Sequence, residues 1–137
     1  MKKSLVLLLA ALLALALGGC NTTVSATPPD LTGNWKQENS DGLNFYQIAT
    51  ITDDTIQCYW YLPEYDEEHL YWTGTFTPPA DGREPYTWTS QNNLENPHLE
   101  QWAERDDTKT FTYEKGQLSY NVNMAHLRMT YALERVE

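Results

Sequence analysis

Few residues of this chain are of types that could do chemistry, and most of them are scattered. The densest polar group comprises Glu64, Asp66, Glu67, Glu68 and His69. Oxygen ligands close together in sequence could hold Ca²⁺, but the spacing differs from that of an EF-hand and the segment lacks the glycine of its sharp turn. The segment therefore predicts a solvated hairpin loop rather than a metal site.

The usual catalytic and metal-binding patterns are missing from the sequence. His69, His98 and His126 lie far apart, without the His-x-x-x-His or Cys-x-x-Cys spacing of zinc sites. The chain contains no Gly-x-Ser-x-Gly or Ser-x-x-Lys motif and no glycine-rich phosphate loop. We therefore expect no metal, no cofactor and no catalytic residue. A small cell-envelope hydrolase is the alternative, although the plentiful carboxylates do not by themselves specify a site.

The N-terminal residues predict export. Lys2 and Lys3 precede an unbroken apolar run over residues 5–17, and Gly18, Gly19 and Cys20 follow it. A charged segment, an apolar segment and small residues at a cut site are typical of a secretory signal. The run is shorter than the roughly 20 apolar residues of a membrane-spanning helix.

The end of this apolar run resembles the lipobox of bacterial lipoproteins, in which an aliphatic residue and two small residues precede a cysteine. The resemblance implies that Leu17, Gly18 and Gly19 are recognised by a signal peptidase that cuts before Cys20. It also implies that Cys20 carries a diacylglyceryl group, and two acyl chains suffice for stable membrane attachment. The protein would then lie at the outer face of the cytoplasmic membrane, or at the outer membrane in a Gram-negative cell. An ordinary signal peptide is the alternative.

Cleavage at this place would divide the chain into a signal peptide (1–19), a lipidated cysteine with a flexible polar tether (20–30) and one domain (31–137). The loss of Lys2 and Lys3 changes the formal net charge from −10 to −12. This charge argues against binding to nucleic acid and against electrostatic adhesion to anionic lipid. Cys58 is left without a disulfide partner, and we expect it to be a small buried hydrophobe.

The domain alternates apolar and polar residues with the period of β-strands. Gly74 predicts a bulge or a close approach of two backbones, and Gly116 predicts a turn with positive φ. A short helix could follow Pro97, over residues 98–105. Strands are expected at residues 33–37, 44–51, 55–62, 70–77, 86–90, 109–113, 118–122 and 127–133.

The fold class follows from the connections between these strands. Parallel crossovers need a dozen or more residues, and no long helix separates the strands, so we expect an all-β antiparallel meander of eight strands with at most one short helix. Eight strands can close into a small barrel, which removes exposed edges. A two-sheet β-sandwich is the alternative.

Residues 31–35, Leu-Thr-Gly-Asn-Trp, resemble the Gly-x-Trp opening of lipocalin-type (calycin) barrels. That resemblance implies a lipocalin-like barrel in which Trp35 plugs the floor beneath the first strand. The lipobox, the tether and a β-domain rich in Trp and Tyr together also resemble small uncharacterised lipoproteins of Gram-positive bacteria and their phages.

Aromatic residues are the remaining candidates for a binding site. The 5 Trp and 9 Tyr residues all follow the predicted signal. One strand face must build the core, whereas another could present aromatic rings to a sugar, a peptide or a protein partner. An inward set could instead line a cavity for a small apolar ligand. Trp60, Trp72 and Trp88 are the candidate ligand-binding residues.

Two functional hypotheses follow from these patterns. The first is a membrane-anchored surface lipoprotein with a non-enzymatic binding or interaction role and an unknown ligand. The second, motivated by the size and form of the chain, is a phage-encoded lipoprotein that interferes with superinfection by a second phage.

Overall fold

The computed structural model describes residues 26–137. The predicted signal peptide, the recognition residues Leu17, Gly18 and Gly19, the lipidation residue Cys20 and the start of the tether lie outside the described residues. The strands are β1 (Gly33–Gln37), β2 (Tyr46–Ile51), β3 (Thr55–Leu62), β4 (Glu67–Thr75), β5 (Tyr86–Gln91), β6 (Thr108–Glu114), β7 (Gln117–Met124) and β8 (Leu127–Val136).

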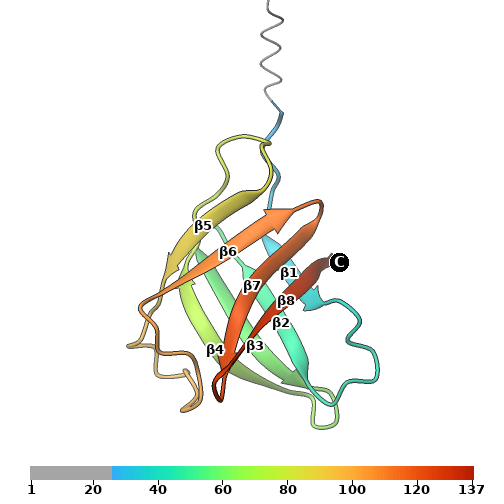
Figure 1. The fold of residues 1–137 in the computed structure, drawn as a ribbon, viewed down its shortest axis with the longest axis vertical. Coiled ribbons are helices and arrows are strands. Elements are labelled where there is room, and N and C mark those ends of the chain that lie inside the picture. Colours follow the sequence, from blue (N-terminus) through green and yellow to red (C-terminus); the bar gives the residue numbers. More distant parts are fainter. Residues whose placement is uncertain (1–25) are drawn as a thin grey trace, which may run out of the picture.

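These strands form one antiparallel sheet in the order β4-β3-β2-β1-β8-β7-β6-β5, which curls into a nearly closed barrel (Figure 1). Closure depends on β1, which pairs with β2 along one edge and with β8 along the other. The predicted all-β meander of eight strands is confirmed, and the alternative sandwich is not adopted. Since all eight strands and the core between them lie within residues 26–137, we expect the domain to fold without residues 1–20.

The core follows the alternation seen in the sequence. On β3, Ile56, Cys58 and Trp60 face inward and are at most 5% exposed, whereas Tyr59 and Tyr61 are only half-buried. Cys58 is a free, fully buried thiol, as predicted. Burial also raises the pKa of the Cys58 thiol to about 12, which keeps it protonated and unreactive at neutral pH.

The barrel has a seam between β4 and β5, where one isolated β-bridge joins Gly74 to Asn92, the residue after β5. A Cβ atom on Gly74 would lie 2.3 Å from Ser90 Oγ and 2.5 Å from the Gln91 carbonyl oxygen. Only glycine therefore allows the two backbones to approach this closely. The close approach predicted at Gly74 is confirmed.

Below that bridge, the connection 92–107 lies against the edge of β4. Its amides donate to three β4 carbonyl oxygens: Asn93 N to Thr73 O (2.8 Å), Glu100 N to Leu70 O (3.3 Å) and Glu104 N to Tyr71 O (3.2 Å). The connection thereby covers an edge strand that would otherwise expose unpaired groups. The helix predicted over residues 98–105 is wrong, because these bonds to β4 leave only isolated turns in that segment.

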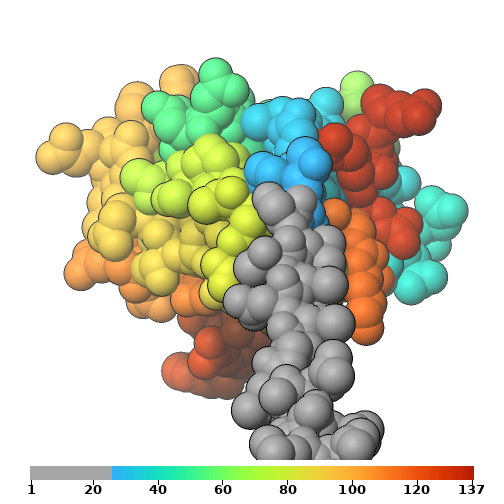
Figure 2. Space-filling view, turned by 90° about the horizontal axis from the view of Figure 1, so that it is seen from above, coloured from blue at the N-terminus to red at the C-terminus, as the bar shows by residue number. Residues whose placement is uncertain are grey.

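One end of the barrel is solidly packed, and we call it the floor. Trp35 is 2% exposed there, and its indole Nε1 donates to the Leu31 carbonyl oxygen at 3.1 Å. The Arg135 guanidinium lies 5.5 Å from the centre of the Trp35 ring, and Tyr113 packs edge-on against the same ring. Figure 2 looks onto this end, where residues 26–32 lie between the β4–β5 connection and the end of β8.

Candidate functional site

A pocket of about 620 Å³ opens at the other end of the barrel, which we call the mouth. In Figure 1 the mouth lies at the lower end, formed by the β1–β2, β3–β4 and β7–β8 connections and by residues 92–107. The aromatic lining consists of Phe45, Trp60, Tyr65, Tyr71 and Trp102. Polar atoms come from Asn44, Glu64 and Asn123.

Trp60 is the centre of the aromatic walls. Its ring lies 5.4 Å from that of Phe45 at an interplanar angle of 76°, and 6.2 Å from that of Tyr71 at 71°. Such edge-to-face pairs are favoured by the ring quadrupoles. Because Phe45 and Tyr71 pack edge to face with Trp60, the three rings form one continuous aromatic wall of the hollow.

A β-bulge brings Tyr71 into this lining. Cys58 pairs with Trp72 but Tyr59 pairs with Leu70, so Tyr71 is an extra residue on β4. Such a bulge re-aims side chains, and here Tyr71 and Trp72 are both buried although they are consecutive. Tyr71 thus faces the pocket while Trp72 packs in the core.

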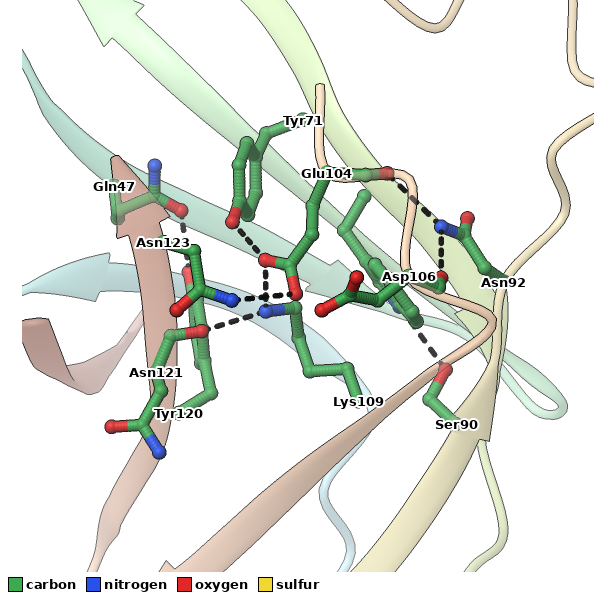
Figure 3. A network of polar contacts seen from close by, with 11 residues as sticks. Gln47, Tyr71, Ser90, Asn92, Glu104, Asp106, Lys109, Tyr120, Asn121 and Asn123 are labelled. Carbon is green, nitrogen blue, oxygen red and sulfur yellow. Dashed lines mark hydrogen bonds and ion pairs between the residues drawn. The ribbon is translucent and has the colours of Figure 1, made fainter. Parts of the chain in front are cut away.

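A buried polar network lies directly behind the Tyr71 wall (Figure 3). Lys109 Nζ contacts Glu104 Oε2 at 2.6 Å, and the two side chains are only 5% and 7% exposed. Lys109 also donates to the Asn121 carbonyl oxygen at 2.6 Å. Two residues of the pocket lining bond to Glu104, since the Tyr71 hydroxyl donates to Oε2 and Asn123 donates to Oε1 at 3.4 Å.

This network fixes the chemical state of the pocket wall. Burial, and then the hydrogen bond to the Glu104 carboxylate, raise the pKa of Tyr71 far above its usual value. Tyr71 is therefore a neutral hydroxyl whose proton is directed to Glu104. The ion pair joins residues 92–107 to β6 and β7. Because Lys109 and Glu104 balance each other, the pair is suited to positioning the wall rather than to proton transfer.

A separate buried hydrogen bond lies beside this network, in which the Tyr120 hydroxyl donates to the Gln47 side-chain Oε1 at 2.8 Å. Gln47 is fully buried, and within the described chain its side-chain Nε2 has no hydrogen-bond partner. Gln47 is not among the residues singled out from the sequence. Its place in the alternation of β2 nevertheless indicates a buried polar group, because a glutamine occupies a core position there.

Of the three tryptophans proposed from the sequence, the structure brings one to the pocket. Trp60 lines it. Trp72 is fully buried and its Nε1 donates to Ser90 Oγ at 3.1 Å, while Trp88 stacks on Phe111 at 5.1 Å. Neither Trp72 nor Trp88 lines the pocket. Phe45, Tyr65 and Trp102 also line the pocket but come from three different connections, so no pattern within one segment marks them as a set.

The acidic group of the sequence lies beside the mouth. Glu67 and Glu68 belong to β4, and His69 contacts both Glu67 and Glu100 at 3.3 Å. His69 also packs against Trp102, with ring centres 5.9 Å apart. Among residues 26–137, no group of three His, Cys, Asp or Glu side chains is arranged to hold a metal ion.

The pocket is suited to binding a small molecule, because an aromatic hollow with a few polar groups is the usual form of such a site. Within residues 26–137, no helix is long and apolar enough to cross a membrane. Comparisons with known proteins add no relationship to this geometry: no family model matches the chain, and neither a search of curated proteins nor one of solved structures found a match.

Proposed function

We propose that this protein is a membrane-anchored lipoprotein that binds, without catalysis, a small ligand with an apolar body in the pocket at the barrel mouth. The observation that carries the proposal is the pocket itself, of about 620 Å³ with five aromatic side chains in its lining. Ligand sites commonly measure roughly 300–1,000 Å³ and are lined mainly by apolar and aromatic groups.

The direction of the pocket supports a role at a membrane surface. The described chain begins with residues 26–32 at the floor, and the mouth lies at the opposite end (Figure 1). A barrel attached through Cys20 and a tether would therefore direct its mouth away from the lipid. A ligand could then enter from the aqueous side without passing between the barrel and the membrane. A lipocalin-type relationship, with Trp35 at the floor, is part of the same proposal.

The packing behind the pocket supports binding by a preformed site. Glu104 joins Tyr71, Asn123 and Lys109, which come from β4, β7 and β6. These bonds hold the inner wall of the pocket in place before a ligand binds, and a preorganised site loses less conformational entropy on binding. The rim is less constrained, since Phe45 and Trp102 are each 50% exposed and Tyr65 is 63% exposed.

The binding part of the proposal is tested with the neutral fluorescent probe N-phenylnaphthylamine and a soluble form that begins at Asn21. We expect saturable binding that Trp102→Ala weakens by about tenfold, since truncation of a central aromatic contact costs more than about 1 kcal/mol. Leu94→Ala is the matched control, because Leu94 lies in the same connection, is 39% exposed and is not part of the lining. Absence of saturable binding, or equal losses in both variants, would contradict the proposal.

The anchoring part is tested on the full chain. We expect the native protein to carry acyl mass on its N-terminal cysteine and to fractionate with membranes. The Cys20→Ser variant should lose the acyl mass. Membrane association of an unacylated wild-type protein would contradict a lipid anchor without affecting the pocket.

A further inference from the structure

The chemistry of the pocket lining favours one class of ligand over others. Five aromatic rings surround the hollow, and the one charged group in the lining is the carboxylate of Glu64. Among the described residues that form this lining, no lysine, arginine or histidine is present. Aromatic faces carry negative potential, so the rings and the carboxylate act on a ligand with the same sign.

The ring geometry suits a compact positive group. Phe45 and Tyr71 each lie nearly perpendicular to Trp60, at 76° and 71°. These three rings form one continuous aromatic wall, and a positive group in the hollow would lie against it. Recognition of quaternary ammonium ligands uses aromatic walls, and tryptophan is the most effective ring for it.

The same protein already holds one cation among aromatic rings. Lys109 Nζ lies 5.4 Å from the centre of the Tyr71 ring, 5.2 Å from that of Trp72 and 5.9 Å from that of Tyr120. Its charge is balanced by Glu104 at 2.6 Å. The ammonium group behind the wall therefore does not present an unbalanced positive charge that would repel a second cation in the pocket.

The charge around the mouth acts in the same direction. The chain has a formal net charge of −10. The exposed β3–β4 hairpin carries Glu64, Asp66, Glu67 and Glu68 beside the opening. A field of one sign at a cleft raises the local concentration of ligands of the opposite sign. An anionic ligand would be repelled at this mouth, and a neutral one would gain nothing from the field.

We propose that the ligand of the mouth pocket is a small organic cation, with an alkylated ammonium group held in the hollow against Trp60, Phe45 and Trp102 and with Glu64 at the rim. This inference rests on the proposed binding function and specifies its ligand class. It is separable from that function, because a neutral apolar ligand could occupy the same hollow.

The test compares two probes of equal shape: choline, and its neutral isostere in which a tert-butyl group replaces the trimethylammonium group. Titrations of the soluble form are followed by the indole resonances of the tryptophans. We expect choline to bind about tenfold more tightly than the isostere, as desolvated cation–π contacts allow. Equal affinities, or tighter binding of the isostere, would overturn the inference.

Leucine variants locate the cation. Trp102→Leu and Phe45→Leu keep apolar side chains at half-exposed positions while they remove the rings. We expect each to reduce the preference for choline to about fourfold or less, since each cation–π contact is worth roughly 0.5 kcal/mol or more, with little change for the isostere. Leu94→Ala should leave the preference unchanged. A preference that survives both ring replacements would place the cation on the acidic hairpin and overturn the inference.

The two proposals fail in different ways. If N-phenylnaphthylamine binds in the pocket but choline is not preferred, the binding function stands and the ligand class is wrong. If neither probe binds, the proposed function itself fails. Glu64→Gln adds a further measure, with an expected loss of choline affinity that high salt diminishes. A loss of isostere affinity of the same size would count against a role for charge.

Discussion

Aromatic residues lie at both the floor and the mouth of this barrel, but the floor is packed and the mouth is hollow. At the floor, Trp35 is 2% exposed and packs against Leu31, Tyr113 and Arg135. At the mouth, Trp102 is 50% exposed, and together with Trp60 it lines a hollow of about 620 Å³. Aromatic content alone therefore does not determine whether an end of the barrel is filled.

The difference arises from how the connections pack at each end. At the floor, the segments before β1 and after β4 bury Leu31 and Phe76 against the core, which completes a packed layer with Trp35. At the seam, β4 has 9 residues but β5 only 6, and β5 ends at Gln91. The connection 92–107 takes its place on the mouth side through backbone bonds to β4. A loop fills this space less completely than a strand would, and the hollow lies beside it.

The largest expected effect compares one residue type at the two ends. Trp35→Ala should lower the free energy of unfolding by about 3–5 kcal/mol, because it removes a large buried side chain and leaves a cavity. Trp102→Ala should cost less than about 1 kcal/mol, since half of its surface is already in water. Urea unfolding followed by far-ultraviolet circular dichroism measures both. Similar losses at the two ends would mean that the mouth is part of the packed core.

The second effect concerns the ion pair that holds the mouth side together. Lys109→Met leaves Glu104 buried without its cation, which should cost about 3–5 kcal/mol. Hydrogen exchange should accelerate at the amides of Asn93, Glu100 and Glu104, which bond to β4, more than at the floor. Adding Glu104→Gln should recover part of the loss, because the uncompensated charge is removed. Uniform acceleration across the barrel would show that the pair supports the whole fold.

The sequence was sufficient for the strands and insufficient for the mouth. Strand alternation located residues 55–62 as the structure has them, because an apolar face repeated every second residue must be buried. The helix expected at residues 98–105 failed because backbone bonds to β4, distant in sequence, outweigh a local pattern. The rim residues Phe45, Tyr65 and Trp102 meet only after the barrel closes, so no spacing within one segment could mark them as a site.

The third effect tests how the seam is closed. Gly74→Ala introduces a Cβ atom 2.3 Å from Ser90 Oγ and 2.5 Å from the Gln91 carbonyl oxygen. Overpacking of this kind typically costs about 1–3 kcal/mol. We expect β4 and β5 to separate at the bridge to Asn92, with loss of protection from hydrogen exchange along the seam. Thr89→Ala is the control, because Thr89 is exposed on the neighbouring strand β5 and its replacement should cost less than about 1 kcal/mol. An equally small effect at both positions would refute close packing at the seam.

The smallest effect measures how far water from the mouth reaches into the barrel. The probe is the ionisation of the Cys58 thiol, which lies between Ile56 and Trp60 on β3. Burial raises the pKa of this thiol from 9.0 to about 12. Above about pH 9 the unfolded chain therefore loses a proton that the folded chain keeps, so alkali favours unfolding. The ionisation of this thiol by itself should lower the free energy of unfolding by about 1 kcal/mol between pH 8 and about pH 9.7.

Urea unfolding of the wild type and of Cys58→Ala over this pH interval isolates the contribution of the thiol, since alanine has no proton to lose. Tyrosines such as Tyr71 and Tyr120, whose pKa burial also raises, add a slope of the same sign in both proteins as the unfolded chain begins to lose their protons. The thiol is therefore measured as the difference between the two slopes. If the wild type and Cys58→Ala share one slope, the thiol ionises equally well in the folded protein. Water would then extend from the mouth past Trp60, and the dry layer that separates the pocket from the floor would be absent.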